Sequence, residues 1–411
     1  MQNDAYMAGA ATTRFGKFPE ATVRSLTEEA VAAALADAGM TARDIETVYF
    51  GNAADGVLSG QEMIRGQAAL RHTGLLGVPI VNVENACASS STAFHLAVAA
   101  VTSGAVDVAL AVGAEKLTHP DKSRSFAAIG TAVDLLQLDE LKAWSRGGPP
   151  GDRDDPVGSV DAADSEKSFF MDIYAANTRA YMARTGATAA DFAEVAVKSH
   201  RHAALNPNAQ YRTPVTADEV LTSRMVSDPL TLLMCSPIGD GASAVVVCSA
   251  RRARTLPGPT ARVRASVLVS GTDVPGAEPA AARASALAYE RAGIGPQDLD
   301  VVEVHDAAAP AELMAYEELG LCGPGEGPAL LKSGATTLGG RVPVNPSGGL
   351  LSRGHPLGAT GCAQLVELTD QLRGRCGPRQ VPGARIALAE NGGGFLGTDP
   401  AAMVVTILTA D

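Results

Sequence analysis

Several features that would place the chain in another class of protein are scarce or missing. Aromatic residues make up 4% of the 411 residues, and no apolar run reaches the roughly 18 residues that a membrane-spanning helix needs. The six cysteines form no Cys-x-x-Cys pair, which argues against a disulfide scaffold or a structural zinc site. Acidic residues number 45 against 33 basic ones, and the net charge of −12 opposes binding to nucleic acid or anionic lipid. We therefore predict a soluble, cytoplasmic protein without metal, membrane or nucleic-acid partner.

Two segments of the sequence share the same pattern of apolar residues, glycine and turn residues. Ala33–Asn52 (AALADAGMTARDIETVYFGN) and Leu287–Asp306 (LAYERAGIGPQDLDVVEVHD) share a helix pattern, a glycine, a turn and an apolar strand. A looser match relates CASSSTAFHLAVAAV, which precedes DVALAVG, to GHPLGATGCAQLVEL, which precedes RIALAEN. Continuous apolar strands between helices are typical of α/β sheets covered on both faces. The sequence thus predicts an α/β fold of two duplicated halves, with two similar sheets around a pseudo-twofold axis.

The domain boundaries follow from where this strand rhythm stops. We predict that residues 1–117 and 236–259 form the first half and residues 260–411 the second. The segment 118–235 lacks the rhythm and contains the acidic run RGGPPGDRDDPVGSVDAADSEK. It is expected to form an inserted loop domain over the site, with a mobile tip near residues 151–164.

Three residues occupy positions that suit nucleophilic catalysis. Cys87 follows an apolar strand at the start of a small-residue helix, where backbone amides favour a thiolate. His355 lies in a glycine-dense loop, from which it can act as the base for a thiol. His305 ends an apolar strand, at the edge where open α/β sheets place their sites. Taken alone, each also fits an ordinary role, as a packed cysteine or a histidine bonded to backbone.

Motifs along nearly the whole chain resemble the thiolase superfamily and are most similar to its sterol-carrier-protein type. They include NACASSSTA, MCSPIGDGASA, HDAAAPAELMAYEELGLC, GGLLSRGHPLGATG and ENGGG. The resemblance implies a five-layered αβαβα fold in which the insertion is the loop domain. It also implies that Cys87 accepts an acyl group from a thioester and that His355 activates the thiol. The oxyanion would be held by His355, His305 and the amides of Cys87 and Gly393.

The sequence departs from this family at the groups that move the α-proton during Claisen condensation. Thiolases use a second cysteine, in the HDCF or the Cys-x-Gly motif, and the matching positions hold Ala307 and Asn391. Neither side chain does acid or base work. We therefore predict intact acyl transfer to Cys87, with Asp306, a water or the acceptor itself supplying the missing proton chemistry.

These residues predict an acyltransferase or condensing enzyme that takes coenzyme A thioesters as substrates and needs no further cofactor. Three alternatives stay open: a decarboxylative condensing enzyme of ketoacyl-synthase type, a retro-aldol lyase, and a non-catalytic subunit of a complex. Retro-aldol relatives lack the nucleophile, so the presence of Cys87 argues against a lyase. A scaffold has no chemical use for the intact NACASS and GHPLGATG motifs.

Expectations about binding partners follow from the same resemblance. CoA carries several negative charges, so a chain of net charge −12 has to gather cations around it. The candidates in the inserted segment are Lys198, Arg201, Arg212 and Arg224. The family implies a homodimer, and its relatives often work with a small OB-fold, zinc-ribbon protein.

Overall fold

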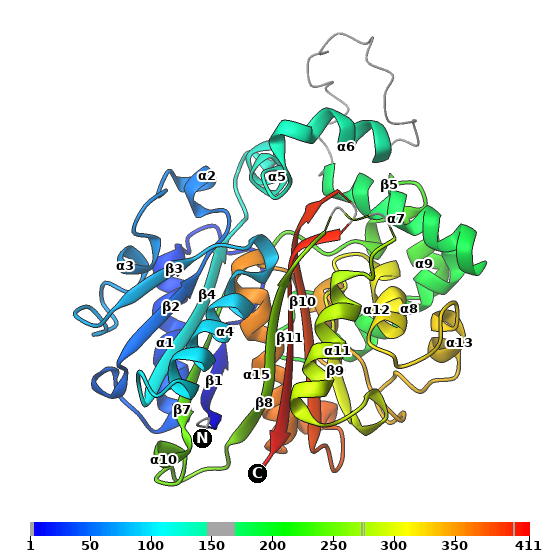
Figure 1. Ribbon diagram of the computed structural model, residues 1–411. Coiled ribbons are helices and arrows are strands. Elements are labelled where there is room, and N and C mark those ends of the chain that lie inside the picture. The colour runs from blue at the N-terminus through cyan, green and yellow to red at the C-terminus, as the bar shows by residue number, and fades with distance from the viewer. Residues whose placement is uncertain (1–3, 146–168, 273, 275, 398) are drawn as a thin grey trace.

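The computed structural model describes residues 4–145, 169–272, 274, 276–397 and 399–411 (Figure 1). The predicted mobile tip at residues 151–164 lies outside the described residues. Among the described helices, none combines the length and apolar character that crossing a bilayer requires.

A nine-stranded sheet, counted over the described residues, forms the centre of the molecule in the order β3-β2-β4-β7-β1-β8-β11-β10-β9. Its strands are β1 (Ala5–Thr12), β2 (Thr47–Gly51), β3 (Ile80–Val83), β4 (Val108–Lys116), β7 (Asp240–Ser249), β8 (Ala261–Ser270), β9 (Val301–Glu303), β10 (Ile386–Leu396) and β11 (Asp399–Ala410). The order β2-β4-β7-β1 in the first half is repeated as β9-β10-β11-β8 in the second. The duplication predicted from the sequence is therefore a duplication of strand topology.

The repeated segment has the same local structure in both copies. Helices α1 (Val23–Ala38) and α11 (Ala280–Ala292) end at Gly39 and Gly293, which have left-handed φ angles of 63° and 67°. Glycine takes this conformation without a steric penalty, and so it ends both helices. In the turn that follows, the carboxylates of Asp44 and Asp298 each accept a backbone N–H three residues upstream, at 2.8 Å.

The two halves are joined more closely than predicted. The sequence suggests two separate sheets, but β1 pairs with β8 in an antiparallel ladder that includes Ala5 with Val263 and Met7 with Ala261. Each half therefore contributes strands to one hydrogen-bonded sheet. This ladder is shorter than the one along the other edge of β1, which pairs over most of its length with β7.

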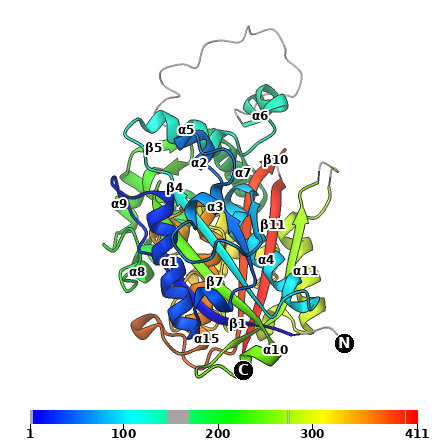
Figure 2. The ribbon, with the colours of Figure 1, turned by 90° about the vertical axis from the view of Figure 1, so that its left-hand side faces the viewer.

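Helices cover the sheet in layers. In β4, Leu110 and Val112 pack in the core beneath α1, whereas Ala109 and Ala111 pack in the core that contains α4 (Ser89–Thr102) and α15 (Thr360–Leu372). This alternation explains why the strand reads as a continuous apolar run. Helices α11 and α12 (Ala309–Glu318) cover the other half. Figure 2 shows α1 and α11 on opposite sides of the molecule.

The remaining elements are short or belong to the inserted segment. The insertion contains α5 (Lys122–Gly130), α6 (Leu138–Ser145), α7 (Phe169–Thr185), α8 (Ala189–Ala203), α9 (Ala217–Thr222), β5 (Met225–Ser227) and β6 (Leu230–Thr231). The short helices elsewhere are α2 (Asp55–Ser59), α3 (Arg65–Ala69), α10 (Ala250–Ala253), α13 (Gly327–Lys332) and α14 (Gly349–Ser352). Figure 1 shows α5 and α6 above the upper ends of β10 and β11. Tyr174 of α7 packs edge-on against Phe395 of β10, which ties the insertion to the sheet.

Candidate active site

A cavity of about 1180 Å³ is lined by residues from both halves and from the inserted segment. Cys87 comes from the first half, His305 and His355 from the second, and Tyr174 from the insertion. A cavity of this size accommodates a drug-sized ligand. The site is thus assembled from parts of the chain that are far apart in sequence.

The backbone before Cys87 is strained in a way that fixes the thiol. Strand β3 ends at Val83, and the short 3-10 helix η2 (Ala86–Ala88) leads directly into α4. Ala86 has a left-handed φ of 47°, which is uncommon for a residue with a side chain and costs about 1–2 kcal/mol. Its amide donates a 2.7 Å hydrogen bond to the Glu84 carboxylate, which stabilises the turn. No residue pattern around Ala86 indicates this strain.

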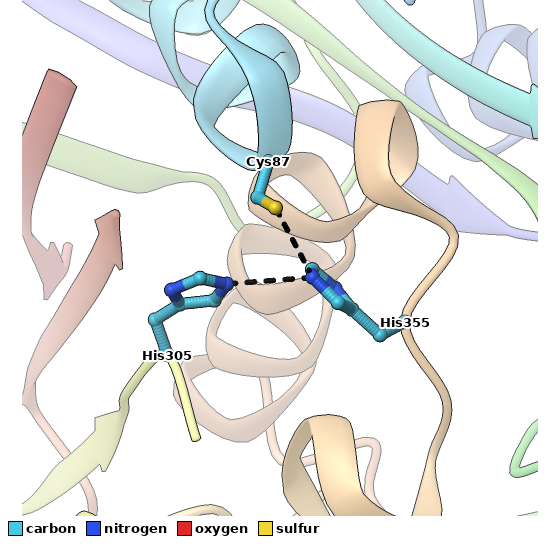
Figure 3. Close-up of side chains that lie close together, drawn as sticks. All are labelled: Cys87, His305 and His355. Atoms are coloured by element: carbon cyan, nitrogen blue, oxygen red, sulfur yellow. Dashed lines mark hydrogen bonds between the residues drawn. The ribbon is translucent and has the colours of Figure 1, made fainter. Parts of the chain in front are cut away.

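His355 lies against the thiol and is held in one tautomer. Its Nε2 is 3.3 Å from Cys87 Sγ, and its Nδ1 is 2.8 Å from Thr360 Oγ1 (Figure 3). The single proton of the Thr360 hydroxyl is donated to the carbonyl of Pro356, so Oγ1 accepts from His355 Nδ1–H. The other ring nitrogen, Nε2, is then free of a proton and faces the sulfur. His355 is therefore placed to accept the thiol proton.

The loop that carries His355 is fastened to the first half of the fold. The buried carboxylate of Glu115, at the end of β4, accepts the backbone N–H of Gly358 at 3.0 Å. It also accepts N–H groups of Ala53 and Ala54. Glu115 thus ties the His355 loop to the segment after β2, and this bridge keeps the base near the nucleophile.

His305 follows β9 and completes the cluster. Its Nε2 is 3.5 Å from His355 Nε2, and the two rings meet edge to face with centroids 5.1 Å apart. Its backbone N–H donates a 2.8 Å hydrogen bond to the Glu390 carboxylate of β10. The three predicted residues Cys87, His305 and His355 are therefore brought together, as Figure 3 shows.

Burial keeps this cluster uncharged at rest. Burial, with smaller contributions from Glu115 and Glu84, raises the pKa of the Cys87 thiol to about 12. Burial also lowers the pKa of His305 to about 4, and it lowers that of His355 well below the ordinary value, with further help from His305. The expectation that the helix start favours a resting thiolate is wrong, because desolvation outweighs the amides. The thiolate has to form as the substrate reacts.

The backbone amides of Cys87 and Gly393 form the predicted oxyanion hole, and a third amide, that of Gly394, lies close to the sulfur. The amides of Cys87 and Gly394 lower the pKa of the Cys87 thiol and so oppose part of the effect of burial. Gly394 has a left-handed φ of 63°. It lies between two residues of β10 that each pair with a residue of β11. Gly393, the predicted partner, packs against the start of the Cys87 helix, where a Cβ would come within 2.1 Å of the Asn85 carbonyl oxygen. Gly393 also lines the cavity, and the contribution of its amide to an oxyanion hole stays a prediction.

Two residues that the sequence places in the site, Asn391 and Asp306, face away from the cavity. Asn391 is buried against α4, where its Oδ1 accepts a 2.6 Å hydrogen bond from the Ser91 hydroxyl. Asp306 is fully buried, and its Oδ1 accepts the Leu350 amide at 2.6 Å. Burial and the neighbouring Glu312 carboxylate raise the pKa of Asp306 well above its ordinary value. Neither side chain lines the cavity, so the placement of Asn391 in the site and the assignment of Asp306 to proton transfer are both wrong.

Only one of the four predicted CoA-binding cations lies at the cavity. Arg224 lines it, whereas the exposed Arg201 and Arg212 do not. Lys198 is buried under the second half, with Nζ 2.5 Å from the Glu312 carboxylate and 2.9 Å from the Val344 carbonyl oxygen. The assignment of Lys198 to CoA is wrong, because its charge is neutralised inside the fold.

Loss of the Lys198 ammonium group is expected to destabilise the protein without weakening acyl-CoA binding. In Lys198→Ala the buried Glu312 carboxylate loses its cation, and the expected cost is about 3–5 kcal/mol of unfolding free energy. Lys332→Ala is the control, because Lys332 pairs with Asp191 while 62% exposed, and its loss should cost about 0–1 kcal/mol. Denaturant unfolding measures both. A raised KM for acyl-CoA with unchanged stability in Lys198→Ala would contradict this role.

Several charged residues at the cavity wall were missed by sequence reasoning. They include Lys17, Arg65, Lys122, Arg184, Glu318 and Glu390. Glu390 stands in the ENGGG motif and had a usable signal: in a strand, the residues at i and i+2 share a face. The others lie on loops and helices, where the sequence gives no such indication.

The Cys87, His305 and His355 ligand atoms all lie within 4.8 Å of one another, a spacing that a single metal ion also requires. Thr360 already fixes the proton on His355, and the donors fit acid/base chemistry on a thiol. That the protein needs no metal or cofactor stays a prediction.

Comparison with known families agrees with the motifs. The chain matches the thiolase N-terminal domain over residues 5–251 and the thiolase C-terminal domain-like family over residues 264–408. The chain belongs to the thiolase family. The acetyl-CoA acetyltransferase of Methanothermobacter thermautotrophicus is 38% identical over 402 residues, covering 96% of this chain and 97% of that protein. Sterol carrier protein 2 of Bos taurus is 34% identical over 407 residues, covering 95% of this chain and 70% of that protein.

The fold is shared with solved thiolase-like structures. The structure of the Ltp2-ChsH2(DUF35) aldolase superimposes with a TM-score of 0.76 at 27% identity, over 99% of this chain and 98% of that chain. The predicted family and fold class are therefore confirmed, and the protein is an acyltransferase of the thiolase family. The domain boundaries predicted from the sequence stay predictions.

Proposed function

We propose that this thiolase-family protein transfers acyl groups from CoA thioesters through a covalent acyl-Cys87 intermediate. The supporting observation is the 3.3 Å contact of Cys87 Sγ with His355 Nε2, the ring nitrogen left without a proton by Thr360. As Sγ attacks the thioester carbonyl carbon, Nε2 takes the thiol proton. The C–S bond to CoA then breaks, and the CoA thiolate leaves with that proton.

The charge that develops on the carbonyl oxygen needs nearby donors. The Cys87 and Gly394 amides point toward the sulfur, so a thioester carbon bound there brings its oxygen close to them. Incubation with a panel of acyl-CoAs followed by intact-mass spectrometry tests the proposal. The expected result is a mass increase equal to one acyl group, and the absence of an adduct with every thioester would overturn it.

Arg224 is expected to contribute to CoA binding through its place at the cavity wall. Replacement by alanine removes a cation from the cavity wall that can pair with a CoA phosphate, and a contribution of about 1 kcal/mol corresponds to a roughly fivefold higher KM for acyl-CoA at low salt. Arg212→Ala is the matched control, because Arg212 belongs to the same segment but does not line the cavity. Equal KM values for the two variants would remove Arg224 from the binding site.

A lyase is the second candidate, because the Ltp2-ChsH2(DUF35) aldolase shares 27% of residues and the fold. The reactive contact between Cys87 and His355 favours acyl transfer instead, since retro-aldol cleavage needs no covalent nucleophile. The mass measurement separates the two: a lyase would cleave a carbon–carbon bond of a β-hydroxyacyl thioester without acylating Cys87.

In a Claisen condensation, a carbon nucleophile would attack the acyl carbon of the acyl-Cys87 intermediate. Homodimerisation, a small OB-fold, zinc-ribbon partner and a cytoplasmic location stay predictions from the sequence.

A further inference from the structure

Carbon–carbon bond formation on acyl-Cys87 requires a group that removes a proton from the acceptor. Ala307 lines the cavity, but its methyl side chain can neither donate nor accept a proton. Asn391 faces away from the cavity. Side chains alternate along β10, so the neighbours of Asn391 on the opposite face, Glu390 and Gly392, line the cavity. The residue of the ENGGG motif that enters the site is therefore a carboxylate.

Glu390 is held next to the catalytic cluster by one of its two oxygens. Its Oε2 accepts the His305 backbone N–H at 2.8 Å, whereas no hydrogen bond from the described residues reaches Oε1. The His305 ring contacts His355, which contacts Cys87. Gly392, two residues along the same face, lies beside the His305 ring, where a Cβ would be 3.4 Å from Nδ1. One carboxylate oxygen is thus anchored, and the other is available to a ligand.

We propose that Glu390 is the catalytic group that takes the α-proton from the acceptor thioester and returns it in the reverse direction. The inference rests on the proposed acyl-Cys87 function. In condensation, the Cα–H bond breaks, the proton goes to Oε1, and its electron pair forms an enolate. The enolate carbon attacks the acyl carbon, and the bond from that carbon to Cys87 Sγ breaks. The released thiolate takes up the proton held by Glu390, which restores the thiol and the carboxylate. In thiolysis the same steps run backward, with protonated Glu390 returning the proton to carbon.

The environment of Glu390 suits transfer in both directions. Burial raises the pKa of its carboxyl to about 7, although the His305 amide opposes part of the shift. A general base works best when its pKa lies near the working pH, because both protonation states are then populated. Asp306 offers no such exchange, since its carboxyl is sealed from the cavity.

The test compares two steps in the full-length protein. Acylation of Cys87 is followed by intact mass, and α-proton removal by deuterium uptake into acetyl-CoA in D₂O. In Glu390→Gln, acylation is expected within about threefold of wild type, whereas exchange falls by roughly 10²–10⁴-fold, the usual contribution of a general base. Glutamine keeps an oxygen to accept the His305 amide, so the wall of the site is preserved.

Two further variants make the result specific. Asp306→Asn replaces a buried carboxyl outside the cavity by its isostere, and exchange is expected within about threefold of wild type. Glu390→Asp keeps a carboxylate but withdraws it, so its exchange rate should fall between wild type and Glu390→Gln, and it carries the test if Glu390→Gln does not fold. Wild-type-like exchange in Glu390→Gln, or no exchange in a wild-type protein that acylates Cys87, would overturn the role of Glu390. Failure of the wild-type protein to acylate at all would instead overturn the proposed function.

Discussion

Replacement of Cys87 by alanine is expected to abolish covalent acylation and turnover together. The reason is geometric: Cys87 Sγ is the atom that His355 faces, and its helix start is held by a strained turn at Ala86. Removal of a catalytic nucleophile typically lowers kcat by about 10⁴–10⁶-fold. Intact-mass spectrometry after acyl-CoA treatment and steady-state turnover measure the two effects.

The matched control uses the second thiol at the cavity wall. Cys235 lines the same cavity, and its Sγ–H donates to the Thr231 carbonyl at 3.4 Å rather than to a histidine. Cys235→Ala should therefore keep the acyl adduct and most of the turnover. A Cys87→Ala protein that still carries one acyl group, or that turns over at near wild-type rate, would contradict the mechanism.

Replacement of His355 by alanine is expected to slow acylation by roughly 10²–10⁴-fold, the usual contribution of a general base. Because burial raises the pKa of Cys87 to about 12, the variant can react only through a rare thiolate. Its acylation rate should then rise about tenfold per pH unit across neutral pH. In the wild-type protein the pKa of His355 lies well below its ordinary value, so the base stays unprotonated and the rate should change little between pH 6 and 8.

Single-turnover acylation measured across this pH range distinguishes the two proteins. A wild-type rate with the same steep rise would mean that free thiolate, rather than a thiol and imidazole pair, attacks the substrate. Circular dichroism of the variant separates this chemical effect from misfolding. Equal acylation rates in the two proteins at pH 7 would remove His355 from the reaction.

The proximity of Cys87, His305 and His355 was predictable because each of them stands in a local motif with its own backbone signal. Cys87 begins a helix of small residues, and His355 lies in a glycine-dense loop. The resemblance then indicated that these distant motifs meet. The repeat around Gly39 and Gly293 likewise follows from local rules, since a left-handed glycine ends each helix.

The predictions that were wrong concern residues whose role depends on which way the side chain points or on a partner far away in the sequence. In a strand, neighbouring side chains point to opposite faces. The family resemblance placed Asn391 in the site, but its neighbour Glu390 is the residue that lines the cavity. The prediction for Asp306 was wrong for a related reason. Asp306 follows His305 directly, but its side chain points into the core, where it accepts the Leu350 amide. Lys198 looked like a surface cation, because its partner Glu312 lies on α12, in the other half of the fold. No pattern within α8 identifies that partner.

The division of the site between two copies of one structural unit has a consequence for how activity depends on assembly. The copy that contains α4 supplies the sulfur, and the copy that contains α15 supplies both imidazoles. The copies have therefore diverged into complementary roles, and neither holds a complete reactive pair. The starts of α4 and α15 touch directly, where Ser90 Oγ accepts the Cys362 amide at 3.0 Å. The reactivity of the Cys87 thiol consequently depends on the correct packing of the two copies against each other. A chain whose halves were misaligned would not react with substrate, even with every motif present.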